Sequence, residues 1–417
     1  METDVVIIGA GSAGLSAAKE LAKHDVSFAV LEASHRIGGR AYSESIGPDA
    51  WFDLGCAYLV IGPDVDTHID ETNPFVDFAK GRGEVMEKYT HPARYHHNRH
   101  TLNGSELAAV EQYHQDCDDI IRQSVERGED VPISDLIDLD NRFFAPYNDM
   151  MAVTHPKDVD EGSALDFHNR VEEHINYNLQ RGYGNLVGAW GRDVDVSLNT
   201  KVERIEWSAH GVSVITPKGT VKAKRLISTV SNGVLASGHI EFSPRLPDWK
   251  LDAIHGIPMG AENKIGVHFT SDVFAPEDTG YFQAWSDDEP GAYIDVNLVS
   301  TNVVTVFIGG RFSQWMEKQG QPAAREFALD RIAAIFGNDI RKSAGRSIGT
   351  AWYTDPWTLG SYSSAAPGQY HQREWMPKPI DDTLFFAGES TARMHGMCHG
   401  AYWSGKRAAH EVIAAEQ

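Results

Sequence analysis

The sequence has few cysteines, no long apolar run and a shortage of basic residues. Its 417 residues include only Cys56, Cys117 and Cys398, and no two of them form a C-x-x-C pair. This excludes a disulfide framework and a cysteine-based zinc site. No apolar run reaches transmembrane length, and a strand-like run begins at residue 4, which leaves no room for a signal peptide. We therefore expect a cytoplasmic protein that does not bind a membrane.

The shortage of positive charge is large. The chain has 37 Lys and Arg against 59 Asp and Glu, a formal net charge of −22. Such a surface repels nucleic-acid phosphates and anionic lipids, so we expect neither as a partner. It suits a cationic substrate, although solubility alone is a sufficient reason for it. The chain is also too long for one compact core, which indicates two or three domains.

The most informative pattern lies in the first 40 residues. Residues 5–8 are an unbroken apolar run, as in a strand buried on both faces. Gly9, Gly11 and Gly14 follow with G-x-G-x-x-G spacing, and residues 12–23 can continue as a helix. In a dinucleotide loop the first glycine permits the turn, the second lets backbone approach a pyrophosphate, and the third allows close helix–strand packing. The pyrophosphate then lies at the helix N-terminus, which favours anions.

A second apolar run strengthens this interpretation, because a glycine turn alone also occurs in ordinary βα units. Residues 28–31 predict a strand that ends at Glu32, about 20 residues after the glycines, where a carboxylate binds ribose hydroxyls. The segment R-I-G-G-R at 36–40 then offers two glycines and an arginine to cofactor phosphates. Residues 53–58 contain another glycine turn. These segments predict a dinucleotide site but leave the dinucleotide open.

Residues 63–190 have a different character. They are polar, with helical patterns at 104–125 and 171–180 and few strand-like runs. His91, His96, His97 and His100 cluster there, but their spacing matches no standard metal site. We therefore expect an exposed polar loop and no metal ion.

The second half of the chain predicts strands, then a mixed segment. A hairpin turn is expected at Lys218-Gly219 and a buried strand at 225–230, followed by strands at 264–269 and 302–308 and a helix at 323–336. A strand at 383–390 precedes a last helix at 397–415. The expected fold class combines α/β and α+β. We expect residues 1–70, 190–255 and 350–417 to form a Rossmann-like FAD-binding domain, interrupted by a second domain from 71–189, mainly helical, and 256–349, a sheet with helices.

Blocks along the whole chain resemble the flavin-dependent amine oxidase family, which includes monoamine and polyamine oxidases and the related histone demethylases. They are L-E-A-S-H-R-I-G-G-R at 31–40, D-L-G-C-A-Y at 53–58, T-K-V-E-R-I at 200–205, A-K-R-L-I-S-T-V-S-N-G-V-L at 223–235, N-K-I-G-V-H-F at 263–269, G-S-Y-S-S-A-A-P-G at 360–368 and F-A-G-E-S-T at 386–391. The resemblance implies an FAD-binding domain of the GR2 type with an interleaved substrate-binding domain, and the flavin ring between them.

The family's motifs also imply which residues surround FAD. Glu32 is expected at the adenosine ribose, Arg40 at the diphosphate, Val202 beside the adenine and Glu389 near the ribitol. The start of the last helix is expected at the flavin edge that becomes anionic on reduction. The expected cofactor site comprises Gly9, Gly11, Ser12, Ala13, Gly14, Glu32, Ala33, Arg36, Gly38, Gly39, Arg40, Gly55, Cys56, Ala57, Tyr58, Val202, Trp352, Trp357, Gly388, Glu389, Gly396, Met397, Cys398 and Ala401.

The same resemblance implies that the chemistry lies at Lys264 and an aromatic wall. The family has a lysine here, hydrogen-bonded through water to the reactive flavin nitrogen, where a cation helps reoxidation by dioxygen. Tyr362 matches one of the two tyrosines that orient the amine in monoamine oxidases, and Met397 replaces the other. Trp357 or Trp352 is therefore expected to complete the wall.

One further position bears on how the cofactor is held. Ser361 stands where monoamine oxidases attach the flavin through cysteine, which implies non-covalent FAD. Cys56 and Cys398 lie in the expected cofactor loops, but neither matches an attachment site.

The predicted reaction is oxidation of a CH–NH or CH–NH2 group in a small-molecule amine. Hydride passes from the α-carbon to the flavin, the imine hydrolyses to an aldehyde or ketone plus ammonia or an amine, and dioxygen reoxidises the flavin to give hydrogen peroxide. Alternatives are an FAD-dependent dehydrogenase or desaturase with another acceptor, a module that binds FAD without catalysis, and an L-amino-acid oxidase. The last needs an arginine at the substrate carboxylate, with Arg94, Arg99, Arg142 and Arg170 as candidates. The sequence allows a homodimer.

Overall fold

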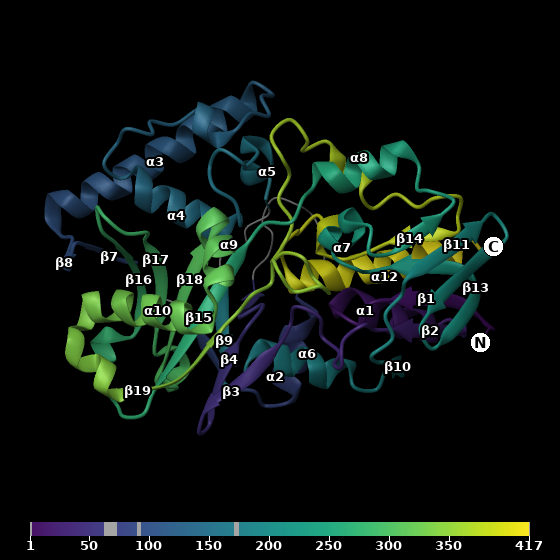
Figure 1. Ribbon diagram of the computed structural model, residues 1–417, viewed down its shortest axis with the longest axis horizontal. Helices are drawn as coiled ribbons and strands as arrows, with labels where there is room; N and C mark the ends of the chain where they lie inside the picture. The colour runs from purple at the N-terminus through teal and green to yellow at the C-terminus, as the bar shows by residue number, and fades with distance from the viewer. Residues whose placement is uncertain (1, 62–72, 90–92, 171–174, 417) are drawn as a thin grey trace.

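The computed structural model describes residues 2–61, 73–89, 93–170 and 175–416. They form two lobes that lie side by side, each built on its own sheet (Figure 1). No helix among the described residues is long and apolar enough to cross a membrane.

The first lobe is Rossmann-like, and its sheet has the order β10-β2-β1-β13-β12-β11-β14, with β20 paired to β13. Its parallel part consists of β1 (Glu2–Ile8), β2 (Phe28–Leu31), β10 (Val196–Ser197), β13 (Gly219–Ser228) and β20 (Leu384–Phe386). The antiparallel extension consists of β11 (Arg204–Ser208) and β12 (Gly211–Thr216), and β14 (Glu241–Ser243) lies parallel to β11. Strands from distant parts of the chain thus meet in one sheet.

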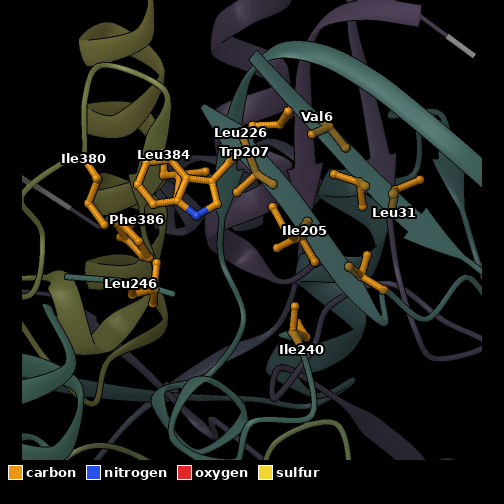
Figure 2. Packing of buried hydrophobic residues seen from close by; sticks show 14 of the residues in the cluster. Val6, Leu31, Ile205, Trp207, Leu226, Ile240, Leu246, Ile380, Leu384 and Phe386 are labelled. Carbon is orange, nitrogen blue, oxygen red and sulfur yellow. The ribbon is translucent and has the colours of Figure 1, made fainter. Parts of the chain in front are cut away.

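Helices cover both faces of this sheet, because successive residues of a strand point to opposite faces. Val5 and Ile7 of β1 pack under α1 (Ser12–Ala22) and α12 (Cys398–Ala414). Val6 faces the other side, where it joins Ile205, Trp207, Leu226 and Phe386 in the core shown in Figure 2. The helices beside that core are α7 (Asn232–Ser237), α8 (Asp248–Gly256) and α11 (Gln372–Trp375).

The second lobe has a sheet of order β19-β15-β18-β17-β16-β7-β8. Its strands are β15 (Glu262–Phe269), β16 (Gly280–Trp285), β17 (Ala292–Val296), β18 (Val303–Gly309), β19 (Ala344–Gly349), β7 (Arg94–His97) and β8 (His100–Thr101). The helices α9 (Gly310–Gln319) and α10 (Gln321–Phe336) cover one face. The other face is covered in part by α3 (Gly104–Glu126) and α4 (Phe144–Thr154), and the rest of it borders the cavity described below.

Smaller elements complete the fold. They are the pair β3 (Ser43–Gly47) and β4 (Ala50–Asp53), the three-stranded sheet of β5 (Tyr58–Ile61), β9 (Ile175–Leu179) and β6 (Met86–Lys88), and the helices α2 (Pro74–Gly81), α5 (Ala164–His168) and α6 (Tyr183–Gly191). Single 3-10 turns lie at Ile133–Asp135, Pro276–Asp278, Leu298–Ser300, Asn338–Ser343 and Glu389–Thr391. The β3–β4 pair packs on the second sheet through Ile46 and Phe52.

Most of the strands and helices expected from the sequence are confirmed, but two expectations are wrong. Residues 171–180 do not continue as a helix at their C-terminal end, because Ile175–Leu179 form β9 between β5 and β6. The alternating I-N-Y-N-L pattern suits a strand, and tertiary pairing overrides the helical pattern. Residues 171–174 lie outside the described part.

The histidine segment is also not an exposed loop. His96 and His97 belong to β7, which pairs with β16, and His100 belongs to β8. His96 is buried against Phe282, and burial lowers its pKa. β7 and β16 are far apart along the chain, so a local sequence pattern cannot indicate that they pair. His91 lies outside the described residues.

Candidate active site

A cavity of about 1050 Å³ lies between the two lobes. It is lined by the β1–α1 loop, residues 31–36, 38–41 and 55–58, the ends of β13 and β20, the start of α12, and part of one face of the second sheet. Its volume is at the upper end of the usual range for ligand pockets, about 300–1000 Å³. Every residue of the expected cofactor site and aromatic wall lines this cavity except Gly14, and Lys264 lines it too.

The three glycines of the β1–α1 loop serve different purposes. A Cβ on Gly14 would lie 2.0 Å from the carbonyl oxygen of Gly9, so this glycine is needed for packing. Gly9 has φ +98°, which disfavours any side chain. A Cβ on Gly11 would meet no protein atom closer than the Cα of Gly39 at 3.8 Å. The protein therefore does not fill the space at Gly11, which borders the cavity and remains available to a ligand.

Glu32 ends β2 with its carboxylate fixed at the rim of the loop. Its Oε2 accepts a hydrogen bond from the amide of Ala10 (2.7 Å), and its Oε1 accepts one from the amide of Ser34 (2.8 Å). The side chain is buried but borders the cavity. A carboxylate held in this way retains free lone pairs for the hydroxyls of a ribose.

Arg40 and Glu389 join the two ends of the chain across the cavity wall. The Nη1 of Arg40 donates to the carbonyl oxygen of Ser361 (2.7 Å) and to Oε1 of Glu389 (3.1 Å). Glu389 also accepts from Ser363 and Gly396. Although burial favours the neutral acid, the charge of Arg40 and these hydrogen bonds lower the pKa of Glu389. The pair is a charged, rigid piece of wall rather than a free arginine.

Two helices begin at the cavity. Ser12 and Cys398, the first residues of α1 and α12, both line it, and the Ser12 hydroxyl donates to the carbonyl oxygen of Cys398 (3.0 Å). The helices approach closely at Gly405, where an added Cβ would lie only 2.0 Å from the carbonyl oxygen of Ala13. The two N-termini thus offer amide donors and positive dipole ends to an anionic ligand.

The second sheet presents a polar and aromatic face to the cavity. Cross-strand pairing aligns Lys264 of β15 with Phe307 of β18 and Phe307 with Tyr293 of β17. Paired residues share a face, and residues two apart along a strand do too. Glu262 and Asp295 therefore lie on the same face as Lys264. The opposite face carries the apolar residues Ile265, Val267, Ile294, Val304 and Val306, which pack under α9 and α10.

Lys264 is only 5% exposed, and it is not a surface charge. Its Nζ donates a hydrogen bond to the carbonyl oxygen of Gly55 and lies 5.4 Å from the centre of the Phe307 ring. The ammonium group therefore connects the second sheet to the loop that follows β4.

Glu262 and Asp295 were not singled out by the sequence. Burial raises the pKa of Glu262 to about 6, with the charge of Lys264 opposing this. Burial likewise raises the pKa of Asp295 to about 6, against the hydrogen bond from Tyr58, the charge of Lys264 and the hydrogen bond from Tyr89. No described residue donates a hydrogen bond to the Glu262 carboxyl, which borders the cavity. Glu262 thus brings an acidic group to the cavity wall, and Asp295 lies on the same sheet face behind Tyr58 and Tyr89, which line the cavity.

The aromatic wall is wider than expected. Tyr362 lines the cavity and its hydroxyl donates to the carbonyl oxygen of Val153. Trp352 lines it as well, and its indole donates to the carbonyl oxygen of Leu54 (3.0 Å). Trp357 borders the cavity but is 41% exposed. Further aromatic side chains line the cavity from the second lobe and β5: Tyr58, Tyr89, Tyr281, Tyr293 and Phe307.

The arginine candidates are separated by the structure. Arg170 lines the cavity, donates to the carbonyl oxygen of Thr154, and lies 5.9 Å from the Tyr362 ring. Arg94 donates to the carbonyl oxygens of Glu277 and Thr279, away from the cavity. Arg142 lies over Phe143, outside the cavity lining. Arg99, in the turn between β7 and β8, does not line the cavity either.

Comparison with protein families gives this geometry its context. Residues 72–413 match the family model "Flavin containing amine oxidoreductase", and residues 7–71 match the model of an NAD(P)-binding Rossmann-like domain. The chain belongs to the flavin-containing amine oxidoreductases. This confirms the resemblance found in the sequence, and the protein is an FAD-dependent enzyme that oxidises amines.

Individual relatives agree with the family. The flavin amine oxidoreductase is 27% identical to Polyamine oxidase 4 of Oryza sativa subsp. japonica, over 98% of this chain and 88% of that protein. It is 28% identical to Lysine-specific histone demethylase 1 homolog 2 of the same plant, over 100% of this chain but 58% of that protein. Wild-type Putrescine Oxidase bound to putrescine shares the fold, with a TM-score of 0.79, 18% identity and 99% of both chains covered.

The residues present fit FAD. The open space at Gly11, the fixed carboxylate of Glu32 and two helix N-termini match a dinucleotide with an anionic diphosphate. Gly11, Glu32 and Arg40 would hold the adenosine and diphosphate part, and the start of α12 would border the flavin. The sheet face with Lys264 leaves room in the same cavity for a substrate.

Proposed function

We propose that this flavin amine oxidoreductase oxidises aliphatic amines that carry a second cationic group, such as diamines or polyamines, and passes the electrons to dioxygen with release of hydrogen peroxide. The observation that carries the substrate class is the buried acid Glu262 in the cavity wall, together with the buried acid Asp295 on the same sheet face, behind Tyr58 and Tyr89. The net charge of −22 and the relatives named polyamine oxidases support it.

The two acids stand at different places along the face. Glu262 and Lys264 belong to β15, and Asp295 belongs to β17, with β18 between them. Across the sheet, two strand spacings correspond to about 10 Å, and along it the acids are four residues apart, because Glu262 pairs with Gly309 and Asp295 with Thr305 of β18. The two backbone positions are therefore about 17 Å apart. A long molecule with ammonium groups at both ends can therefore extend from one acid toward the other, while a monoamine can meet only one.

Glu262 is placed to act on the reacting nitrogen. An amine must be neutral to give up hydride, and it arrives in water as an ammonium ion. A carboxylate with a pKa of about 6, next to Lys264 and lining the cavity, can accept that proton near neutral pH. FAD, when bound, supplies the two-electron acceptor for the C–N bond.

Asp295 acts from behind two hydroxyl groups. Tyr58 and Tyr89 donate to its two oxygens, at 2.5 Å and 3.3 Å, and both tyrosines line the cavity. Its negative charge is thus fixed beside the aromatic wall, where a second ammonium group gains both the carboxylate field and cation–π contact. The aromatic side chains also exclude water, which strengthens both interactions.

The finer parts of the proposal concern the oxidant and the cofactor. Lys264 places a buried cation in the cavity, where negative charge that develops on dioxygen reduction would be stabilised. Ser361 in place of an attachment cysteine supports non-covalent FAD. Release of all flavin on acid precipitation would support this, and flavin retained in the pellet would contradict it.

The decisive experiment is rapid anaerobic mixing of the FAD-loaded protein with matched amines. A diaminoalkane should bleach the flavin absorbance at much lower concentration than the monoamine of the same chain length. Dioxygen added afterwards should restore the absorbance and yield one peroxide per amine. Equal reduction by both amines would contradict the substrate class. Reduction without peroxide would favour a dehydrogenase.

A further comparison tests the alternative that the substrate is an amino acid. Because Arg170 lines the cavity, a diamino acid should be compared with its decarboxylated diamine. Faster reduction by the amino acid would assign Arg170 to a substrate carboxylate and replace the diamine proposal.

A further inference from the structure

Two cysteines from opposite ends of the chain meet in the cofactor cavity. Cys56 follows β4 in the loop that holds Gly55, and Cys398 is the first residue of α12. Both line the cavity and both pack against the same apolar cluster, which includes Tyr183 and Leu186. Each thiol is also the largest influence on the pKa of the other, so the two side chains are neighbours in the cavity wall. They are therefore close enough to react without a rearrangement of the lobes.

The two thiols have unequal environments. The neighbouring Cys56 thiol lowers the pKa of Cys398, with nearby Ser12 assisting and burial opposing. Cys398 also lies at a helix N-terminus, where the dipole favours a thiolate. The same interaction with Cys398, together with burial, raises the pKa of Cys56 well above its usual value. Cys398 thus has the character of an attacking thiolate and Cys56 that of its protonated partner.

We propose that Cys56 and Cys398 form a reversible disulfide in response to hydrogen peroxide produced in this cavity. The inference rests on the proposed function for the source of the oxidant. A low-pKa thiol beside a second thiol is the arrangement found in redox-sensing cysteines. Cys117, the remaining cysteine, is buried in α3 and takes no part.

The reaction balances with peroxide as the only oxidant. The Cys398 thiolate attacks one peroxide oxygen, the O–O bond breaks, and the hydroxide that leaves takes up a proton to become water. Cys56 then attacks the sulfenic sulfur of Cys398; the S–S bond forms, the S–O bond breaks, and a second water leaves with the Cys56 proton. Two thiols and one peroxide thus give one disulfide and two waters, and two electrons pass from sulfur to oxygen.

The disulfide would act on the site through Gly55. The carbonyl oxygen of Gly55 accepts the hydrogen bond of Lys264, and Cys56 is the next residue. Contraction of a thiol–thiol contact to a covalent bond pulls this loop toward α12 and displaces the carbonyl. Since misplacing a positioned group by about 1 Å can reduce a rate by up to ~10²-fold, we expect the oxidised enzyme to be about tenfold slower or more.

The test uses the FAD-loaded enzyme and counts thiols as well as activity. Peroxide added without amine should lower the titratable thiols in the denatured chain from three to one, and dithiothreitol should restore them. Non-reducing peptide mapping should show the Cys56 and Cys398 peptides cross-linked and two hydrogens lighter. Turnover with an amine should give the same product, and catalase should prevent it.

The two experiments, with added peroxide and with amine turnover, distinguish failure of this inference from failure of the proposed function. If no amine yields peroxide, the proposed function fails, but the arm with added peroxide still tests the cysteine pair. If added peroxide leaves three titratable thiols, or oxidises either cysteine without a cross-link, the disulfide is refuted.

Three variants sharpen the assignment of roles. Cys56→Ser should leave Cys398 to accumulate one or two oxygens on peroxide treatment, with no cross-link. Cys398→Ser should leave Cys56 reduced under the same dose. Cys117→Ser, remote from the cavity, should cross-link as the unaltered protein does. Cross-links that persist without Cys398, or oxidation that begins at Cys56, would overturn the proposal.

Discussion

Replacing Glu262 by glutamine is expected to make the protein more stable and less active, and both effects should depend on pH. Glutamine keeps the size of the side chain and removes its ionisation. The magnitude of the stability effect follows from the pKa of Glu262, which burial raises from 4.5 to about 6.

The stability effect follows from this difference in pKa. Between pH 4.5 and about 6 the native state binds the proton that the unfolded state has released, so the protein loses stability as the pH rises through this window. The difference corresponds to about 2 kcal/mol, fully lost above pH 7. The Glu262→Gln variant has no ionisable group at this position, so it does not lose this stability as the pH rises. Its free energy of unfolding should exceed that of the unaltered protein by about 2 kcal/mol at pH 8, and the two should converge near pH 4.5.

The activity effect has the opposite sign. A carboxylate and an ammonium about 4 Å apart attract by about 4 kcal/mol at an effective dielectric constant of 20. We expect desolvation of the ammonium to cancel roughly half of this. The remaining ~2 kcal/mol corresponds to a kcat/KM about thirtyfold lower for Glu262→Gln at pH 8. Near pH 5 the carboxyl is protonated in the unaltered enzyme too, so the ratio should approach one.

Two measurements check this prediction. Urea unfolding at pH 5 and pH 8, with FAD saturating, gives the stability difference, and initial rates at both pH values give kcat/KM. Glu241→Gln, at an exposed site on β14, is the control and should change neither quantity between the two pH values. A thirtyfold loss that persists unchanged at pH 5, or a variant less stable than the original at pH 8, would refute the reasoning.

Three further predictions concern other parts of the cavity. Asp295→Asn should raise KM about tenfold or more for a diaminoalkane, because an interaction with a charged group contributes about 1.5–3 kcal/mol, and should leave KM for the matching monoamine unchanged. Asp339→Asn, at an exposed site, should alter neither KM value. An equal effect on both amines would contradict a role for Asp295 in holding the second ammonium. Lys264→Met should leave the rate of anaerobic flavin reduction within a few-fold of normal and slow reoxidation about 10²-fold, as loss of an electrostatic stabiliser does. Stopped-flow traces with slow reduction and normal reoxidation would contradict this role for the lysine. Gly11→Ala should fold normally but bind FAD weakly, because its Cβ enters the cavity without meeting protein atoms. The control is Gly188→Ala, whose Cβ is also unobstructed but lies outside the cavity, and this variant should bind FAD as before. Full flavin content in Gly11→Ala would show that the cofactor does not approach this residue.

The parts of the site that the sequence predicted are those with a local pattern. The glycine loop and Glu32 lie within one βαβ unit, where the number of residues between two positions determines how they are placed relative to each other in the fold. Lys264 stands out because a charged residue interrupts an apolar strand. The structure confirms that it is buried and borders the cavity.

The parts that were missed depend on contacts between distant segments. β7 reaches the second sheet by pairing with β16, which is far along the chain, and its short R-Y-H-H run has no apolar alternation. Likewise, the contact between Cys56 and Cys398 exists only because α12 packs on α1 at the mouth of the nucleotide loop. Single-sequence patterns do not report register between such segments.

The acids on the cavity face could nevertheless have been found by a stricter reading of the strands. A strand buried on both faces is normally a continuous apolar run, and every residue of β15 and β17 is buried. In such a strand, Glu262 and Lys264 at alternate positions, and likewise Tyr293 and Asp295, mark one face as different from the other. Because buried charges are costly unless something compensates them, an alternating charged face inside a core indicates a face that meets a ligand. The opposite charges of Lys264 and its two acidic neighbours further indicate that this ligand is itself charged, and the excess of acids over bases on the face favours a cation.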